Sequence, residues 1–316
     1  MVPTNEVMKR YFNDPQKVDT LGRVVRRDIA SLAQNGTRLG IRIDNFAERI
    51  TSILTNPASG PASVRSVFSN HMAACIRTLD PAFEVSTPPV MTAEEASVFY
   101  RKKVIERNLK ISTVAAGLGG LALFEANSLA GCLIGGAVWM MGSAYLMKKG
   151  ISLAMDIPYR SPAAYNDKFK LVIFNPEYDP RLLELLGWHE STHAVQDSNP
   201  AWKLGPMHKA YMEGQATDVE HQHGMSSEDE EVRFYTLFDR SCLLLPCYLT
   251  LADAHRQDTS DFDEDPWTIK IEERSINWFV NPLHCIGASV FSVARELKEL
   301  PTNRDILNGN FSFLAA

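Results

Sequence analysis

Two apolar runs stand in the middle of the chain and limit its fold more than any other feature. Residues 111–124 read ISTVAAGLGGLALF, residues 129–147 read LAGCLIGGAVWMMGSAYLM, and EANS separates them. The second run carries no charge over about the length that a bilayer core requires, whereas the first is shorter than the usual span of ~17–25 residues. Gly131 and Gly135 have the GxxxG spacing that lets two helices approach closely. The pattern predicts a helical hairpin over 111–147.

The charges around this hairpin bear on where it resides. Basic residues stand at both of its ends, RKK at 101–103 and the pair Lys148 and Lys149, while the tip holds Glu125. This layout is typical of a hairpin whose two ends stay on the cytoplasmic side of a membrane. A mean hydropathy of -0.15 limits any embedding to this piece of the chain. The sequence favours membrane contact through 111–147, and the alternative is a Gly- and Ala-rich helical pair buried in the protein's own core.

Charge and composition exclude several classes of protein. The 316 residues include 32 Lys and Arg against 38 Asp and Glu, so no cationic field exists to hold a phosphate backbone. Nucleic acid is therefore not expected as a partner. Five cysteines, an odd number, are too few and too dispersed for a disulfide framework. The N-terminus lacks the apolar core of a signal peptide, so we expect a cytoplasmic protein, membrane-associated if the hairpin meets a bilayer.

Changes in composition along the chain predict three parts. Residues 1–90 form a helical N-terminal region, which includes a short helix over 62–79. Residues 91–150 contain a helix that opens on the capping box TAEE at Thr92, followed by the apolar hairpin. Residues 151–316 have the composition of an ordinary globular domain. The expected fold class is α+β and mainly helical, with a small sheet.

The third part begins with strong start and stop signals. KFKLVIF at 168–174 is a β-branched and aromatic run that predicts a strand. Asp179 and Pro180 form the N-cap and first residue of a helix that Pro200 ends, and a second helix is predicted over 206–224. The remainder predicts an acidic loop (226–231), an apolar helical stretch (232–252), a second acidic loop (253–265) and a final helix (275–299).

The first of these two helices carries the sequence HESTH. His189 and His193 differ by about 40° in azimuth and ~6 Å in rise, so their imidazoles leave one helix face and can share a metal ion. Glu190 lies about 100° round the helix, too far to be a ligand of that ion but near enough to reach a water molecule beside it. This arrangement is what metal-assisted hydrolysis needs.

A catalytic zinc site with three protein ligands needs one more His, Glu or Asp. Glu213 lies in the second predicted helix, within the sequence EGQA, and the intervening loop can turn the chain so that the two helices face each other. Asp197, one turn after His193, is the rival third ligand.

A strand, HExxH on a helix and EGxA on a following helix together resemble the gluzincin class of zinc metallopeptidases. The resemblance covers about 168–224 and identifies no particular family. It implies a zincin-like domain in which Zn²⁺ is bound by His189, His193 and Glu213, Glu190 is the general base, and a protein or peptide is the substrate. It also implies that 168–174 is the edge strand on which an extended peptide docks.

Three residues depart from related motifs. Gln196 and Asn199 stand where the metzincin extension has glycine and histidine, and Thr217 replaces the aspartate of the ExxxD form of the second helix. The carboxylate that orients a ligand histidine must therefore come from elsewhere, the candidates being Glu220, Asp197 and Asp218. A group that stabilises the developing oxyanion is also needed, and the candidates are His221, His223, Tyr235 and Arg240.

Two further patterns carry less chemistry. The acidic spacing in 261–272 resembles a calcium loop, but Pro266 occupies the position that requires glycine, so we interpret the segment as an acidic surface loop. Cys242 and Cys247 lie in an apolar context that predicts buried, inert thiols. The leading functional hypothesis is zinc-dependent peptide hydrolysis. The alternative is a membrane-inserting or membrane-anchored interaction protein whose zinc site is structural or vestigial.

Overall fold

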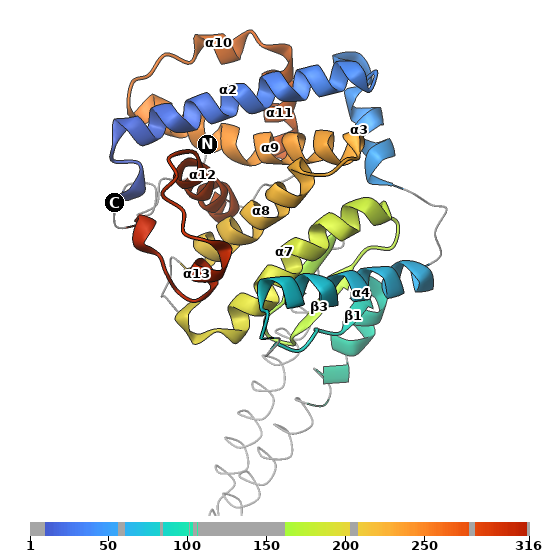
Figure 1. Cartoon of the computed structure of the whole chain (residues 1–316). Coiled ribbons are helices and arrows are strands. Elements are labelled where there is room, and N and C mark those ends of the chain that lie inside the picture. Colours follow the sequence, from blue (N-terminus) through green and yellow to red (C-terminus); the bar gives the residue numbers. More distant parts are fainter. Residues whose placement is uncertain are drawn as a thin grey trace, which may run out of the picture. The chain divides into compact units, whose positions relative to one another are not determined.

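The protein is mainly helical, with one small sheet (Figure 1). The computed structural model describes residues 10–55, 61–82, 85–100, 102–103, 106, 162–202, 208–277 and 282–314. The apolar hairpin predicted over 111–147 lies outside these residues. Among the described residues, no helix combines the length and the apolar composition needed to cross a bilayer.

The chain divides into two compact units. The larger comprises residues 1–89, 165–172 and 176–316, and the smaller comprises 90–164 and 173–175. In the smaller unit, residues 93–100 are helical, and the predicted capping box at their start is confirmed. Thr92 Oγ1 accepts a hydrogen bond from the Glu95 N–H at 3.3 Å, and the Glu95 carboxylate accepts one from the Thr92 N–H at 3.0 Å.

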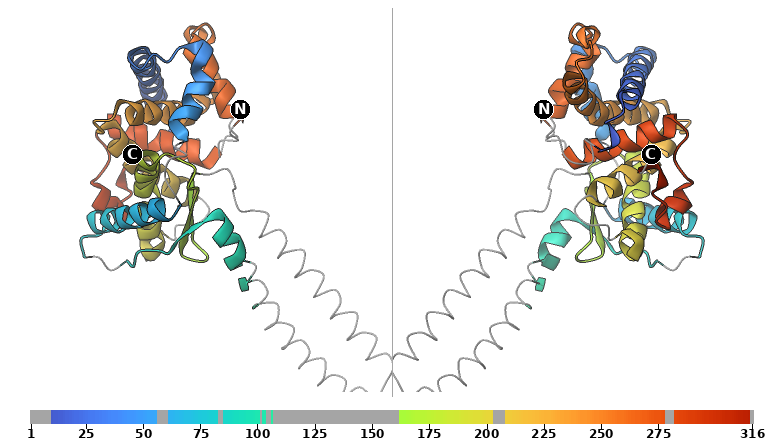
Figure 2. Two further views of the ribbon diagram at one scale, coloured as in Figure 1. Left: turned by 90° about the vertical axis from the view of Figure 1, so that its right-hand side faces the viewer. Right: turned by 90° about the vertical axis from the view of Figure 1, so that its left-hand side faces the viewer.

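The N-terminal part of the larger unit is helical, as predicted. Helix α2 (Pro15–Arg38) begins at Asp14, whose carboxylate accepts a hydrogen bond from the Gln16 N–H at 2.9 Å. It lies beside α9 (Glu230–Ala254) in Figures 1 and 2 and buries its apolar face there. The elements that follow α2 are η1 (Ile43–Asn45), α3 (Phe46–Leu54) and α4 (Pro61–Leu79).

The two helices of the predicted site form where their caps indicate. Helix α7 (Pro180–Ser198) starts after Asp179, whose carboxylate accepts a hydrogen bond from the Arg181 N–H at 2.8 Å. Helix α8 (His208–Met225) follows the short η2 (Pro200–Trp202). Helix α7 packs between α4 and α8, and a small apolar cluster fills the space between them. The fold therefore brings the HESTH helix against the EGQA helix.

The C-terminal part contains a helix that we interpreted as a loop. The acidic surface loop predicted over 261–272 is wrong, because α11 (Pro266–Asn277) occupies most of it. Asp265 acts as its cap, since its carboxylate accepts a hydrogen bond from the Thr268 N–H at 2.8 Å, and proline is well suited to the first helical position. The other elements here are α10 (Ser260–Asp263), α12 (Pro282–Glu296), α13 (Asn303–Leu307) and η4 (Ser312–Leu314).

The sheet corrects the expected position of the predicted strand. Strands β1 (Val90–Thr92), β2 (Ala163–Asn166) and β3 (Leu171–Phe174) pair in the order β1-β3-β2. The run 168–174 was expected to be an edge strand, but its strand portion β3 is central, and all four of its residues are buried. A continuous apolar run without alternation is typical of an enclosed strand, which is why this expectation was wrong.

Helices α8 and α12 cross with their backbones in contact. A Cβ added to Gly287 would lie 1.9 Å from the Ala210 carbonyl oxygen, and one added to Gly214 would lie 2.6 Å from the Gly287 carbonyl oxygen. Both neighbours are backbone atoms, so the contact cannot relax by rotating a side chain. These two glycines set how near α12 comes to the helix that carries Glu213.

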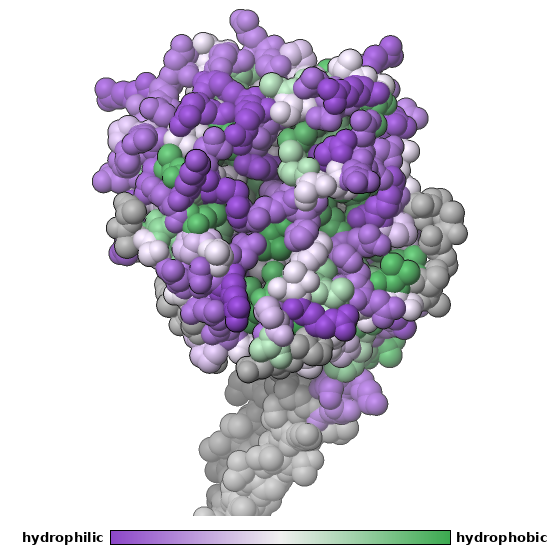
Figure 3. Space-filling model, viewed as in Figure 1, coloured by the Kyte–Doolittle hydropathy of each residue, from purple (hydrophilic) through white to green (hydrophobic). Residues whose placement is uncertain are grey.

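The surface seen in Figure 3 is that of a polar protein. Hydrophilic residues dominate this face, and hydrophobic residues appear between them as separate patches. The main apolar core lies instead under α2, α9 and α12, where Leu21, Leu244 and Phe291 are fully buried.

The glycine crossing generates a test of stability. We expect Gly287→Ala and Gly214→Ala each to lower the free energy of unfolding by about 1–3 kcal/mol, because the new methyl group forces the two backbones apart. Thermal or urea unfolding measures the change. Ser52→Ala is the matched control, since Ser52 is exposed on α3 and the new alanine meets no packed neighbour. Equal stability of the glycine variants and the control would contradict the tight crossing.

Candidate metal centre

Three side chains from α7 and α8 converge on one point. His189 Nε2 and His193 Nε2 lie 3.0 Å apart, and Glu213 Oε2 lies 3.5 Å from the first and 3.4 Å from the second. Zinc binds imidazole nitrogen at ~2.0–2.1 Å, so the ligand atoms of a tetrahedral site are separated by about 3.3–3.4 Å. The three atoms thus form a triangle of nearly the size that one face of such a site requires.

Buried partners fix the rings of the two histidines. His189 Nδ1 lies 2.9 Å from Glu220 Oε2, and His193 Nδ1 lies 3.0 Å from Gln196 Oε1. Because a carboxylate and an amide oxygen only accept hydrogen bonds, both Nδ1 atoms carry a proton, and both Nε2 atoms face the centre, each with a lone pair when its ring is neutral. Gln196 in turn donates to Gln215 Oε1 on α8 at 2.9 Å, which ties the two helices together beside the centre.

The glutamate between the histidines is held separately. Glu190 is 4 % exposed, and its Oε2 accepts a hydrogen bond from the backbone N–H of Tyr165 on β2 at 2.6 Å. Burial raises the pKa of Glu190, and the positive potential of His189 and His193 opposes that rise. A carboxylate with a raised pKa is a better proton acceptor near neutral pH.

The converging groups form an electrostatic unit. Burial works against the charged form of every member, but the two histidines hold the pKa of Glu213 well below its usual range. The pKa values of His189 and His193 are raised despite their burial, because Glu213 and, for His189, Glu220 favour their protonated forms. One carboxylate and two imidazoles at this spacing therefore favour positive charge between them, whether it comes as protons or as a cation.

A third histidine joins the cluster from α12. One ligand atom each of His284, His189 and Glu213 lie within 4.8 Å of one another. His284 Nε2 forms a hydrogen bond with Thr217 Oγ1, one turn along α8 from Glu213. The sequence analysis missed His284 because no motif surrounds it, and it reaches the centre only through the crossing of α8 and α12.

The structure places the three candidate carboxylates in different surroundings. Asp197 accepts hydrogen bonds from Tyr165 Oη at 2.8 Å and from Lys170 Nζ, so its oxygens are engaged by the β2–β3 turn. Asp218 accepts two hydrogen bonds from the guanidinium group of Arg295 on α12, one on each carboxylate oxygen. Glu220 is the one of the three that contacts a histidine of HESTH.

The candidates for oxyanion stabilisation also have partners. His221 lies 3.1 Å from Asp239, His223 stacks on Trp188 with ring centroids 3.6 Å apart, and Arg240 pairs with Asp28 at 2.9 Å. Tyr235 is 3 % exposed in the core. A group that stabilises the oxyanion has to lie beside the metal centre. His284 does so, although it was not among the candidates drawn from the sequence.

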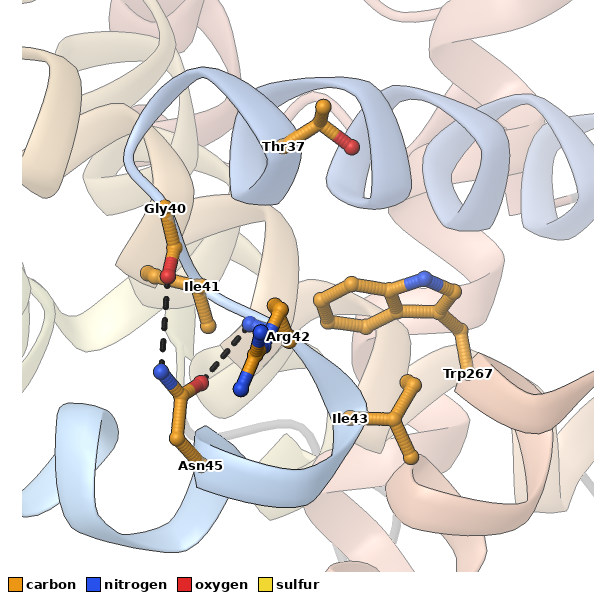
Figure 4. Close-up of a pocket in the computed structure, with 7 residues that line it drawn as sticks. All are labelled: Thr37, Gly40, Ile41, Arg42, Ile43, Asn45 and Trp267. Atoms are coloured by element: carbon orange, nitrogen blue, oxygen red, sulfur yellow. Dashed lines mark hydrogen bonds between the residues drawn. The ribbon is translucent and has the colours of Figure 1, made fainter.

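A pocket of about 590 Å³ lies elsewhere in the larger unit (Figure 4). Asn45 lines one side of it, where its side chain accepts a hydrogen bond from the Arg42 N–H at 2.7 Å and donates one to the Gly40 carbonyl at 3.4 Å. The lining residues are Thr37, Gly40, Ile41, Arg42, Ile43, Asn45 and Trp267. They include no histidine or carboxylate, so this hollow is not part of the candidate metal centre.

Comparison with known proteins adds no assignment. No family model matches the chain, and searches of curated proteins and of solved structures found no match either. The chemistry of the centre is therefore argued from its own geometry.

Trp188, next to His189 in the chain, lies among two other histidines. His223 stacks on its indole, and His71 of α4 meets it edge to face at 6.0 Å. Burial lowers the pKa of His71, against the opposing effect of Glu184. Burial, together with the proximity of His71, lowers the pKa of His223. A histidine with a lowered pKa in the folded state stabilises the fold above its unfolded value of ~6.5 and loses that contribution as the pH falls through its folded pKa.

This cluster predicts an acid-sensitive contribution to stability. We expect the free energy of unfolding to fall less steeply for His71→Leu than for the unmodified protein between pH 7 and pH 5, because leucine fills the space without titrating. Urea unfolding at a series of pH values gives the free energy of unfolding of both proteins. In the difference between them, the contributions of the other histidines largely cancel. His255→Asn, which removes a histidine at the end of α9, serves as the control. Parallel pH profiles for His71→Leu and the unmodified protein would contradict the assignment.

Proposed function

We propose that this protein is a zinc-dependent metallopeptidase in which His189, His193 and Glu213 bind the metal. The supporting observation is the triangle of His189 Nε2, His193 Nε2 and Glu213 Oε2, whose sides of 3.0, 3.4 and 3.5 Å approach those of a tetrahedral zinc site. Two imidazole nitrogens and one carboxylate oxygen are also one of the donor sets that three-ligand catalytic zinc sites use.

The surroundings of the triangle fit a resident metal ion. Both Nδ1 protons are directed away from the centre by Glu220 and Gln196, so each histidine presents a lone pair in the manner that metal-binding histidines require. A zinc ion held here would supply Lewis acidity toward a carbonyl group and toward a water molecule. A set of three protein ligands leaves the fourth position of a tetrahedral site to water or substrate, as in catalytic zinc sites.

Glu190 is the proposed general base. Its carboxylate belongs to the same turn of α7 as His189 but leaves the helix at a different azimuth, so it can take a proton beside the metal without binding the metal. The Tyr165 N–H holds one of its oxygens, which leaves the other oxygen to accept that proton and to pass it on to the departing amine. His284 is the candidate for stabilising the negative charge that develops on the carbonyl oxygen.

The substrate proposed is an extended peptide or protein segment. Because β3 is enclosed, docking by backbone pairing has to use an outer strand. Strand β2 is the one whose backbone reaches Glu190, through Tyr165. A peptide lying along β2 would therefore pass close to the general base.

The role of Glu190 gives the first test. Glu190→Gln keeps the size of the side chain and can still accept the Tyr165 N–H, but it cannot accept a proton. Hydrolysis should fall by at least about 10²-fold, within the range that general-base catalysis contributes. Zinc content should stay unchanged, as measured by elemental analysis of the full chain, and activity is followed on a fluorescent peptide library. Equal cleavage by the variant and the unmodified protein would exclude Glu190 as the base.

The ligand set gives the second test. We expect His189→Ala, His193→Ala and Glu213→Ala each to abolish stoichiometric zinc binding, because two ligands do not hold the ion against competing chelators. Glu220→Gln and Gln196→Ala should weaken zinc affinity by about 10–100-fold through the orientation of the histidines. Competitive titration with a chromophoric chelator measures these affinities.

Asp197→Asn is the matched control for this series, because Asp197 bonds to Tyr165 and Lys170 rather than to a histidine. Its zinc affinity should equal that of the unmodified protein. If Asp197→Asn lost zinc and Glu213→Ala retained it, Asp197 would be the third ligand.

A further inference from the structure

Thr217 occupies the position where the related ExxxD motif places a carboxylate, yet the structure gives it a different partner. It is 1 % exposed, and its hydroxyl bonds to His284 on α12. The orientation of His189, which would otherwise need that carboxylate, is supplied by Glu220 one turn further along α8. Thr217 is therefore available for another task.

The helix crossing fixes the backbone around His284, so only its side chain can change position. Gly214 and Thr217 lie three residues apart on α8, as do His284 and Gly287 on α12, so each pair shares a helix face. The glycines bring these two faces into backbone contact, which fixes the separation of the two helices at this level. Rotation of the His284 side chain then determines how near its ring comes to the ligand triangle.

His284 is near enough to be a candidate fourth ligand, because one of its ligand atoms lies within 4.8 Å of ligand atoms of His189 and Glu213, but its ring stands further out than that of His193. The centroid of its ring is 5.6 Å from that of His189, whereas the ring of His193 lies 4.7 Å from it. The ring nitrogens of His189 and His193 contact Glu213 directly, while His284 Nε2 is engaged by Thr217. A fourth protein ligand would need its nitrogen about 3.3–3.4 Å from the other three ligand atoms.

We propose that Thr217 is a positioning residue that keeps His284 out of the coordination sphere of the metal, so that one coordination position stays open for substrate. This inference rests on the proposed zinc site and adds to it the reason why four convergent side chains hold a three-ligand centre. Without the hydroxyl, the half-buried His284 nitrogen loses the hydrogen bond that holds its ring, and the ring can turn toward the ligand triangle, which lies within 4.8 Å. Removing the hydroxyl is thus expected to convert the site into a closed four-ligand one.

The experiment loads the full chain with Co²⁺ and uses azide as a probe of the open position. In the unmodified protein, azide should change the visible absorption spectrum of Co²⁺. In Thr217→Val, which keeps the shape of threonine, azide should cause no change, and Co²⁺ should bind more tightly because the metal gains a protein ligand. Thr217→Ser, which keeps the hydroxyl, should behave like the unmodified protein. The double variant Thr217→Val with His284→Ala should recover the response to azide.

X-ray absorption of the zinc-loaded unmodified protein and of His284→Ala gives an independent measurement that does not need the valine variant to fold. The same number of histidine ligands in both is expected. One fewer in His284→Ala would show that His284 already binds the metal and would overturn the inference. An azide response in Thr217→Val equal to that of the unmodified protein would also overturn it, while leaving the zinc site intact. Failure of the unmodified protein to bind either metal would remove the proposed function together with this inference.

Discussion

The backbone contact between α8 and α12 is the constraint on which the arrangement of the candidate site depends. Helix α8 carries Glu213 and the residues that orient its neighbours, and α12 carries His284. Only because Gly214 and Gly287 lack side chains can the two helices approach so closely. Helix α7 then packs on the other side of α8, so one helix positions groups for both of its partners.

The centre is surrounded by polar groups that are buried but satisfied. Glu220 and Gln196 each use their acceptors on a histidine, and Gln196 uses its amide on α8. Leaving any one of these groups without a partner would cost about 1–3 kcal/mol, so their arrangement resists small displacements. Such an arrangement suits the proposed metal site, which needs its ligand atoms held in a fixed geometry.

Local signals predicted the helices and much of the cluster, because caps and i, i+4 spacing are properties of neighbouring residues. Asp179 and Pro180 marked the start of α7, and HESTH placed two histidines on one face of it. His284 could not be found this way, since its approach depends on a helix crossing between residues far apart in the chain. The central position of β3 and the helix α11 were missed for a different reason: an apolar run was interpreted by its resemblance, and Pro266 was interpreted as an obstacle to calcium binding rather than as a helix start. The apolar runs over 111–147 stay a prediction.

The hydrogen bond from Tyr165 to Glu190 has a consequence for how the chain tolerates mutation. Its donor is a backbone N–H, which every residue except proline supplies. Substitution at position 165 by any residue other than proline therefore keeps the hydrogen bond to Glu190 available. The tyrosine side chain is free to be selected for a separate purpose, the bond from its hydroxyl to Asp197. Tyr165 thus makes one hydrogen bond, to Glu190, that nearly every substitution preserves, and another, to Asp197, that a change to phenylalanine would remove.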